Sequence, residues 1–204
     1  MAGPTHTTDA WVLAKRPPSD VFQTLTLFSV VDGAVLALQR LSKKATPVSA
    51  LDLFDEASLV LEAPTQGQAF FVKEARILQR RSGIGRSYDS LRLASAFASL
   101  VARNPVAEDS RGDVYALLRL SFDAFANSER PDIVYLKSVY RFCRDEGYPL
   151  KQAWAPTLPP ADRETLAEVL NQPLEKQSAD ARIVARLQRK LDDYLRGETE
   201  ILLD

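Results

Sequence analysis

The chain has 204 residues, 46% of them hydrophobic and 26% charged, a composition typical of a folded globular protein and not of a disordered one. Its formal net charge is −1, so the molecule as a whole does not attract polyanions strongly. One cysteine and one histidine exclude an intrachain disulfide and argue against structural zinc, so we expect no metal and no cofactor. No secretion signal and no run of about 18 apolar residues is present, which predicts a cytoplasmic protein without a membrane span.

The first 78 residues carry the signature of β-structure. Residues 21–28 alternate between two sets of side chains with a period of two, as a strand does. Asp32-Gly33 predicts a two-residue hairpin in which both residues take positive φ. Residues 1–8 are small and polar and are expected to fray, with His6 as a surface residue in that tail. The predicted strands are residues 10–14, 21–28, 34–41, 58–62 and 70–78.

The pattern changes after residues 80–86, which contain Gly83 and Gly85 and are interpreted as a hinge. Apolar residues then recur at helical spacing up to the end of the chain. The predicted helices cover about residues 91–101, 113–127, 131–146, 160–170 and 180–196. Strands followed by helices, without alternation, exclude a doubly wound sheet. We expect an α+β protein with two domains, a five-stranded barrel over residues 8–82 and an all-helical domain over residues 86–204.

A search for catalytic chemistry gives no candidate. Phosphate-binding, dinucleotide-binding, nucleophile-elbow and zinc-protease motifs are all absent from the sequence. His6 lacks a neighbouring group to hold it as a general base. Cys143 lies on an apolar helical stripe and is interpreted as a buried structural thiol, with a nucleophile as the alternative. The adjacent acidic pairs are interpreted as solvated surface charge. We therefore expect a protein that is not an enzyme.

Clustered basic residues lie in or next to the predicted barrel. A pair of lysines or arginines is usually a solvated surface, but Arg40, Lys43 and Lys44 are predicted at a strand end and in the following loop, where a nucleic-acid strand could pass. Aromatic residues on the same strands could stack on bases, although most must fill the core. The candidate DNA-binding residues are Arg40, Lys43, Lys44, Lys15, Arg16, Arg80 and Arg81, and the candidate aromatic residues are Trp11, Phe22, Phe28, Phe70 and Phe71.

Several stretches of the chain resemble the RecO family of bacterial DNA repair and recombination proteins. In the first half the resemblance covers the predicted strands and the Asp32-Gly33 turn. In the second half it covers a helix that ends in Gly147-Tyr148. The stretches are residues 10–16, 19–28, 36–40, 51–59, 139–149 and 191–197. The match spans most of the chain but contains no single diagnostic motif.

Membership of this family implies an oligonucleotide-binding (OB) fold and an accessory protein that binds and anneals single-stranded DNA. It also implies contact with RecR and with the acidic, aromatic-ended tail of the single-stranded DNA-binding protein. The family's basic strand end and loop match Arg40, Lys43 and Lys44. Many members insert a four-cysteine zinc module after the Gly-Tyr helix. Here Tyr148 runs directly toward the next helix, so no zinc is expected.

A partner tail requires cations beside an apolar slot. Lys137, Arg141 and Arg144 fall at positions i, i+4 and i+7 and therefore share one helical face, which makes them the candidate protein-docking residues. Alternatively, this stripe only pairs with acidic residues of a neighbouring helix. For the whole chain, two further hypotheses remain open, a relative that acts only through protein contacts and an unrecognised enzyme.

Overall fold

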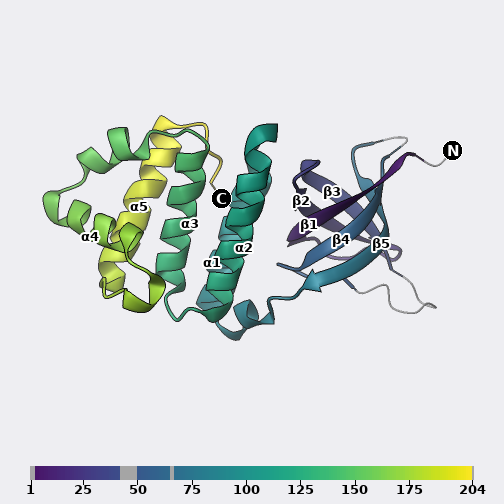
Figure 1. Ribbon diagram of the computed structural model, residues 1–204, viewed down its shortest axis with the longest axis horizontal. Helices are drawn as coiled ribbons and strands as arrows, with labels where there is room; N and C mark the ends of the chain where they lie inside the picture. The colour runs from purple at the N-terminus through teal and green to yellow at the C-terminus, as the bar shows by residue number, and fades with distance from the viewer. Residues whose placement is uncertain (1–2, 42–49, 65–66, 204) are drawn as a thin grey trace. The chain divides into compact units, whose positions relative to one another are not determined.

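The computed structural model describes residues 3–41, 50–64 and 67–203 of the chain. Strands occupy the first part of the sequence and helices the second, so the protein is of the α+β class, as predicted (Figure 1). The chain forms two compact units. The first unit contains residues 1–82 and 101–118, and the second contains residues 83–100 and 119–204. The predicted division had placed residues 101–118 with the helical domain.

The strands of the first unit form one mixed sheet that closes on itself. Neighbouring strands pair in the order β1-β2-β3-β5-β4, and β4 pairs with β1. All pairs are antiparallel except β3 and β5, which are parallel over Ala37–Gln39 and Phe70–Val72. The strands are β1 (Thr5–Lys15), β2 (Phe22–Ser29), β3 (Gly33–Arg40), β4 (Glu56–Glu62) and β5 (Phe70–Gln79). All five predicted strands are therefore present.

One face of each strand fills the interior of this sheet. In β2, Leu25 and Leu27 are fully buried while the alternate residues Thr24 and Thr26 are only partly buried, which is the predicted period of two. The interior cluster is completed by apolar residues of the other strands and of the segment before β4: Ala10, Val12, Ala37, Leu51, Ala57, Leu59 and Leu61. Burial of each large aliphatic side chain contributes about 1.5–3 kcal/mol.

β1 is buried on both faces over Ala10–Leu13, which explains its continuous apolar run. Val12 belongs to the interior cluster, whereas Trp11 packs against Tyr115, with ring centroids 5.7 Å apart. The Trp11 Nε1–H donates to the Tyr115 carbonyl at 3.3 Å. These contacts join residues 101–118 to the sheet, because a buried indole requires both an apolar neighbour and a hydrogen-bond acceptor.

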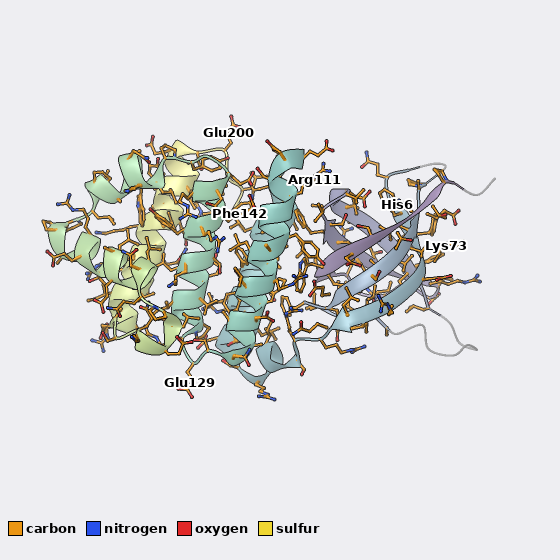
Figure 2. The ribbon with its side chains drawn as sticks, in the orientation of Figure 1. His6, Lys73, Arg111, Glu129, Phe142 and Glu200 are labelled. Atoms are coloured by element: carbon orange, nitrogen blue, oxygen red, sulfur yellow. The ribbon has the colours of Figure 1, made fainter. Side chains whose placement is uncertain are left out.

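The helices follow the predicted order. They are α1 (Tyr88–Arg103), α2 (Arg111–Asn127), α3 (Pro131–Asp145), α4 (Pro160–Asn171) and α5 (Ala181–Glu198). Short 3-10 helices span Ser82–Arg86, Glu108–Ser110, Ala155–Thr157 and Leu174–Lys176, and a π-helical turn spans Leu150–Trp154. In the second unit, α3 packs against α4 and α5, with Phe142 of α3 fully buried (Figure 2). No helix of the described residues is long and apolar enough to cross a bilayer.

Two local predictions were wrong. Residues 5–8 do not fray, because they pair with β4, and His6 opposes Leu61. The β2–β3 hairpin has a three-residue loop, Val30-Val31-Asp32, and only Gly33 takes a positive φ (69°). The predicted hinge contains the 3-10 helix Ser82–Arg86, in which a Cβ on Gly83 would lie 2.6 Å from the Ala126 carbonyl oxygen. Close packing therefore explains that glycine.

Candidate functional site

One region of the outer surface of the sheet combines aromatic and basic side chains. Residues that oppose each other in neighbouring strands share a face, as do residues two apart in one strand. Phe22 opposes Arg40, Thr24 opposes Leu38, and Leu38 opposes Phe71. These five residues therefore lie on one outer face of β2, β3 and β5.

The Phe22 and Phe71 rings contact each other on this face. Their centroids are 6.0 Å apart and their planes are tilted by 59°. Phe71 is 36% exposed and Phe22 is partly buried, so both rings retain accessible surface. In contrast, Trp11 and Phe28 are fully buried, and Phe70 packs against the interior cluster. Three of the five candidate aromatics thus lie in or against the core, which agrees with the expectation that most of them fill it.

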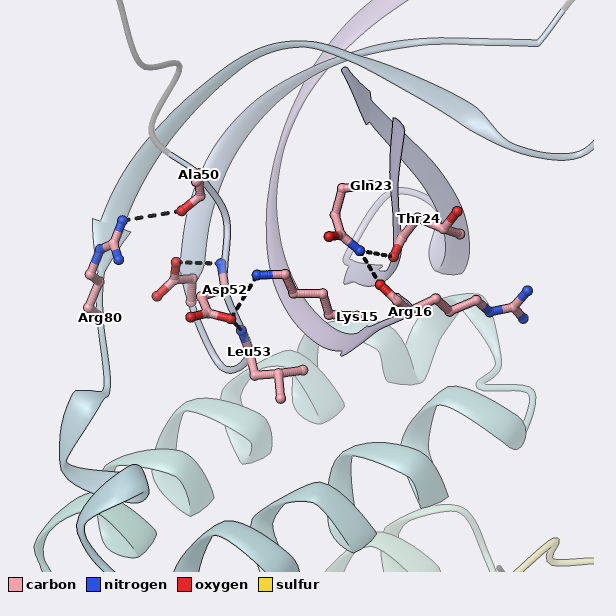
Figure 3. A network of polar contacts seen from close by, with 9 residues as sticks. Lys15, Arg16, Gln23, Thr24, Ala50, Asp52, Leu53 and Arg80 are labelled. Atoms are coloured by element: carbon pink, nitrogen blue, oxygen red, sulfur yellow. Dashed lines mark hydrogen bonds and ion pairs between the residues drawn. The ribbon is translucent and has the colours of Figure 1, made fainter. Parts of the chain in front are cut away.

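Two arginines border this aromatic pair. Arg40 is exposed at the end of β3, and its guanidinium makes no hydrogen bond or ion pair with any described residue. Arg16 follows the last residue of β1, and its backbone N–H donates to the Thr24 carbonyl at 3.0 Å. The Arg16 side chain points away from the Lys15–Asp52 pair (Figure 3). We call the set Arg16, Phe22, Thr24, Leu38, Arg40 and Phe71 the outer patch.

The side chains of Lys15 and Arg80 bind polar groups of the turn before β4 (Figure 3). The Lys15 ammonium lies 3.2 Å from Asp52 Oδ1, and Arg80 Nη2 donates to the Ala50 carbonyl at 3.3 Å. Within the turn, the Asp55 carboxylate accepts from the Asp52 backbone N–H at 2.9 Å. This turn holds Phe54 at a φ of 64°, a left-handed conformation that is unusual for a bulky residue. Lys15 and Arg80 therefore have a structural role in the turn.

Arg81 was predicted to contact DNA, and the structure instead buries it. Its guanidinium carbon lies 4.3 Å from the centre of the Trp11 ring, and its side chain is 1% exposed. Nη2 pairs with Glu56 Oε2 at 3.4 Å, and the Tyr115 hydroxyl donates to Glu56 Oε1 at 3.0 Å. An arginine enclosed in this way cannot reach a phosphate, so we remove Arg81 from the candidate site. The candidates Lys43 and Lys44 lie outside the described residues.

The predicted docking residues of α3 are already bonded. The Lys137 ammonium donates to the Gln172 carbonyl at 2.7 Å, and burial lowers the pKa of this group. Arg141 and Arg144 both pair with Asp145, at 3.4 and 2.6 Å. Pairing with an acidic residue was the alternative to docking, and the partner is on α3 itself and not on a neighbouring helix. Arg141 and Arg144 remain about half exposed, so docking stays a prediction.

The remaining candidates for chemistry have structural partners. Cys143 is fully buried, as predicted, and burial raises its pKa to about 12, which leaves no thiolate for attack at neutral pH. The expectation that no group holds His6 was wrong, because its Nε2 lies 3.0 Å from Asp32 Oδ2 and its ring packs edge-on against Phe70. In the part of the chain that the structure describes, no three His, Cys, Asp or Glu side chains are grouped to hold a metal ion.

Comparisons with family models and with curated proteins find no match to this chain. The geometry of the outer patch is therefore the main indication of function. Sequence reasoning identified Arg16 and Arg40 as candidates and included Phe22 and Phe71 among its aromatics. It did not find that Phe22 and Phe71 meet, because β3 lies between their strands and their contact depends on the register of two strand pairs.

Proposed function

We propose that this protein binds single-stranded DNA on the outer patch and acts as an accessory protein of DNA repair or recombination of the RecO type. The observation that carries the proposal is the Phe22–Phe71 pair with Arg40 beside it. Aromatic rings stack on unpaired bases of any sequence, and arginines neutralise the neighbouring phosphates. A duplex hides the faces of its bases, so this combination favours a single strand.

The strand order supports the same proposal. A ring of β1-β2-β3-β5-β4 with a parallel β3–β5 pair is the arrangement of a five-stranded OB barrel. In such barrels the face formed by strands 2 and 3 binds oligonucleotides. The outer patch lies on the corresponding strands here. Annealing of strands, contact with a RecR-like protein and a cytoplasmic location belong to the proposal through the family resemblance.

The test is fluorescence anisotropy with a labelled single-stranded thymidine 20-mer. Phe71→Ala removes a stacking surface worth about 1–3 kcal/mol per base, which corresponds to a loss of affinity of about 5- to 150-fold. Leu78→Ala is the matched control, because Leu78 is on the same strand and similarly exposed (40%) but outside the outer patch. Equal losses in the two variants, or none in Phe71→Ala, would place binding elsewhere and favour a protein-interaction role.

The basic part of the patch has its own test. The logarithm of the affinity for a single strand falls with the logarithm of the salt concentration, with a slope of about −0.7 per neutralised phosphate. Arg40→Gln should therefore flatten the slope by about 0.7. Arg76→Gln, an exposed arginine of β5 outside the outer patch, should leave it unchanged. An unchanged slope in Arg40→Gln contradicts a phosphate contact at this residue.

A further inference from the structure

Helix α5 presents arginines on the side opposite its packing face. Val184, Leu187, Leu191 and Leu195 are buried, whereas Arg182, Arg186 and Arg189 are exposed. The three arginines fall at positions i, i+4 and i+7, so they form one stripe. At 1.5 Å of rise per residue the stripe is about 10 Å long. Residues 181–191 contain no acidic side chain. We call Arg182, Arg186 and Arg189 the α5 stripe.

One arginine of the stripe is anchored and two are available. Arg186 and Lys190 both bind the carboxylate of Asp162, whose side chain is 4% exposed. Arg186 is still 47% exposed after this contact. The guanidinium groups of Arg182 and Arg189 make no hydrogen bond or ion pair with any described residue. The stripe therefore carries positive charge that the second unit does not neutralise.

The position of Arg182 is unfavourable for the helix itself. It lies in the first turn of α5, which contains no acidic residue. The helix dipole places partial positive charge at this end, so an arginine here destabilises the helix while an anion is attracted to it. The N-cap residue Asp180 compensates part of this charge, because its carboxylate accepts the Arg182 backbone N–H at 2.8 Å. The Arg182 guanidinium is not part of that contact and is available to an anion.

The absence of apolar surface selects the type of anion. None of the large exposed hydrophobic side chains among the described residues lies on α5. An acidic peptide with an aromatic end needs an apolar slot, whereas a phosphate backbone needs only cations at intervals. We propose that the α5 stripe is a second nucleic-acid contact that binds the phosphate backbone without reading bases. This inference shares its ligand class with the proposed function but uses a different site.

The test uses the full chain and a labelled 20-mer of deoxyribose phosphate that carries no bases. The double variant Arg182→Gln/Arg189→Gln removes two phosphate contacts and should flatten the salt slope by about 1.4. Relative to wild type, its affinity should therefore fall by about 25-fold more at 0.1 M salt than at 1 M salt. The control Arg92→Gln/Lys151→Gln makes the same change of charge at exposed positions on α1 and the π-helical turn, and should keep the wild-type affinity. Equal affinity of wild type and stripe variant overturns the inference.

Further arms separate the two sites and the two kinds of partner. Phe71→Ala should keep its affinity for the base-free oligomer and lose affinity for the thymidine 20-mer. If Phe71→Ala binds both like wild type while the stripe variant does not, the outer patch fails and the α5 stripe stands. Polyglutamate is the competitor that stands for an acidic protein. If it displaces the labelled base-free oligomer at a lower concentration than the unlabelled oligomer does, the α5 stripe binds an acidic protein and the inference is overturned. Arg182→Gln should not lower the melting temperature, and a fall would show that Arg182 is structural.

Discussion

Each unit of the protein buries a carboxylate that binds arginine, but the two sites differ in where the cation lies. In the first unit both partners are enclosed, since the side chains of Arg81 and Glu56 are 1% and 4% exposed. In the second unit Asp162 is buried, but Arg186 and Lys190 reach it from a solvent-exposed side. An enclosed pair loses all contact with water, whereas Arg186 and Lys190 stay partly hydrated while they bind Asp162. Both arrangements are structural, but only the second holds its cations at the surface of the protein.

The exposed surfaces differ in a related way. The outer patch of the first unit joins arginines to aromatic rings, a combination suited to bases as well as phosphates. The α5 stripe of the second unit has arginines alone. The contrast predicts two contacts with different ligand requirements, although both regions carry similar charges.

The largest expected effect concerns the enclosed ion pair. Arg81→Met removes the cation and leaves Glu56 buried, so the free energy of unfolding should fall by about 3–5 kcal/mol. Urea unfolding measures this change. The double variant Arg81→Met/Glu56→Gln removes the uncompensated charge and should recover part of the loss. A loss below about 1 kcal/mol in the single variant would contradict the view that both partners are enclosed.

A smaller effect is expected at the open site. Asp162→Asn weakens the contacts to Arg186 and Lys190 and should lower the free energy of unfolding by about 1–3 kcal/mol at pH 7. Hydrogen bonds from these two cations hold the pKa of Asp162 below its ordinary value of 3.8. Its stabilising contribution is therefore complete above about pH 4 and is lost as pH falls through the lowered pKa. Wild type and Asp162→Asn should converge in stability under acid conditions.

Cys143 provides a separate readout for the second unit. Its burial and its pKa of about 12 make it unreactive toward thiol reagents at pH 8 until the unit opens. Asp162→Asn should speed this labelling about tenfold for each 1.4 kcal/mol of local stability that is lost. The control variant Glu168→Gln, on the same helix, should leave the labelling rate unchanged. Equal rates for wild type and Asp162→Asn would show that Asp162 does not stabilise the surroundings of Cys143.

The smallest effect is expected at Asp55 in the first unit, where the sign is reversed. Burial raises the pKa of this carboxyl above 3.8, so ionised Asp55 is disfavoured in the folded state. The folded state gains stability relative to its neutral-pH value as pH falls toward the raised pKa. Asp55→Asn keeps an acceptor for the Asp52 N–H and should change the free energy of unfolding by less than about 1 kcal/mol at pH 7. A large loss at pH 7 would contradict this reading.

Local pattern was sufficient to predict the order and type of the elements. The alternation in residues 21–28 and the helical spacing after residue 88 both correspond to observed elements. The early part of β1 was missed because Thr5–Thr8 are polar, and only their pairing with β4 reveals a strand. Polar residues can form a strand when the neighbouring strand supplies the hydrogen bonds.

The candidate site was harder to predict, because burial of a charge depends on distant partners. Arg81 resembles Arg40 in sequence, yet Glu56, Trp11 and Tyr115 enclose Arg81 and nothing described encloses Arg40. Glu56, Trp11 and Tyr115 are all 25 or more positions away from Arg81 in the chain. The α5 stripe was also missed, because the helical spacing of Arg182, Arg186 and Arg189 does not show which of their guanidinium groups are paired in the fold.

The most direct test of the central claim is to map amide chemical shifts while the thymidine 20-mer is titrated into the full chain. The account predicts shifts at Phe22, Leu38 and Phe71, together with a separate set on residues 182–189 that also responds to the base-free oligomer. The account would be contradicted if no amide shifted, or if the shifts were confined to the surroundings of the opposed pair Ser58 and Arg76 on β4 and β5.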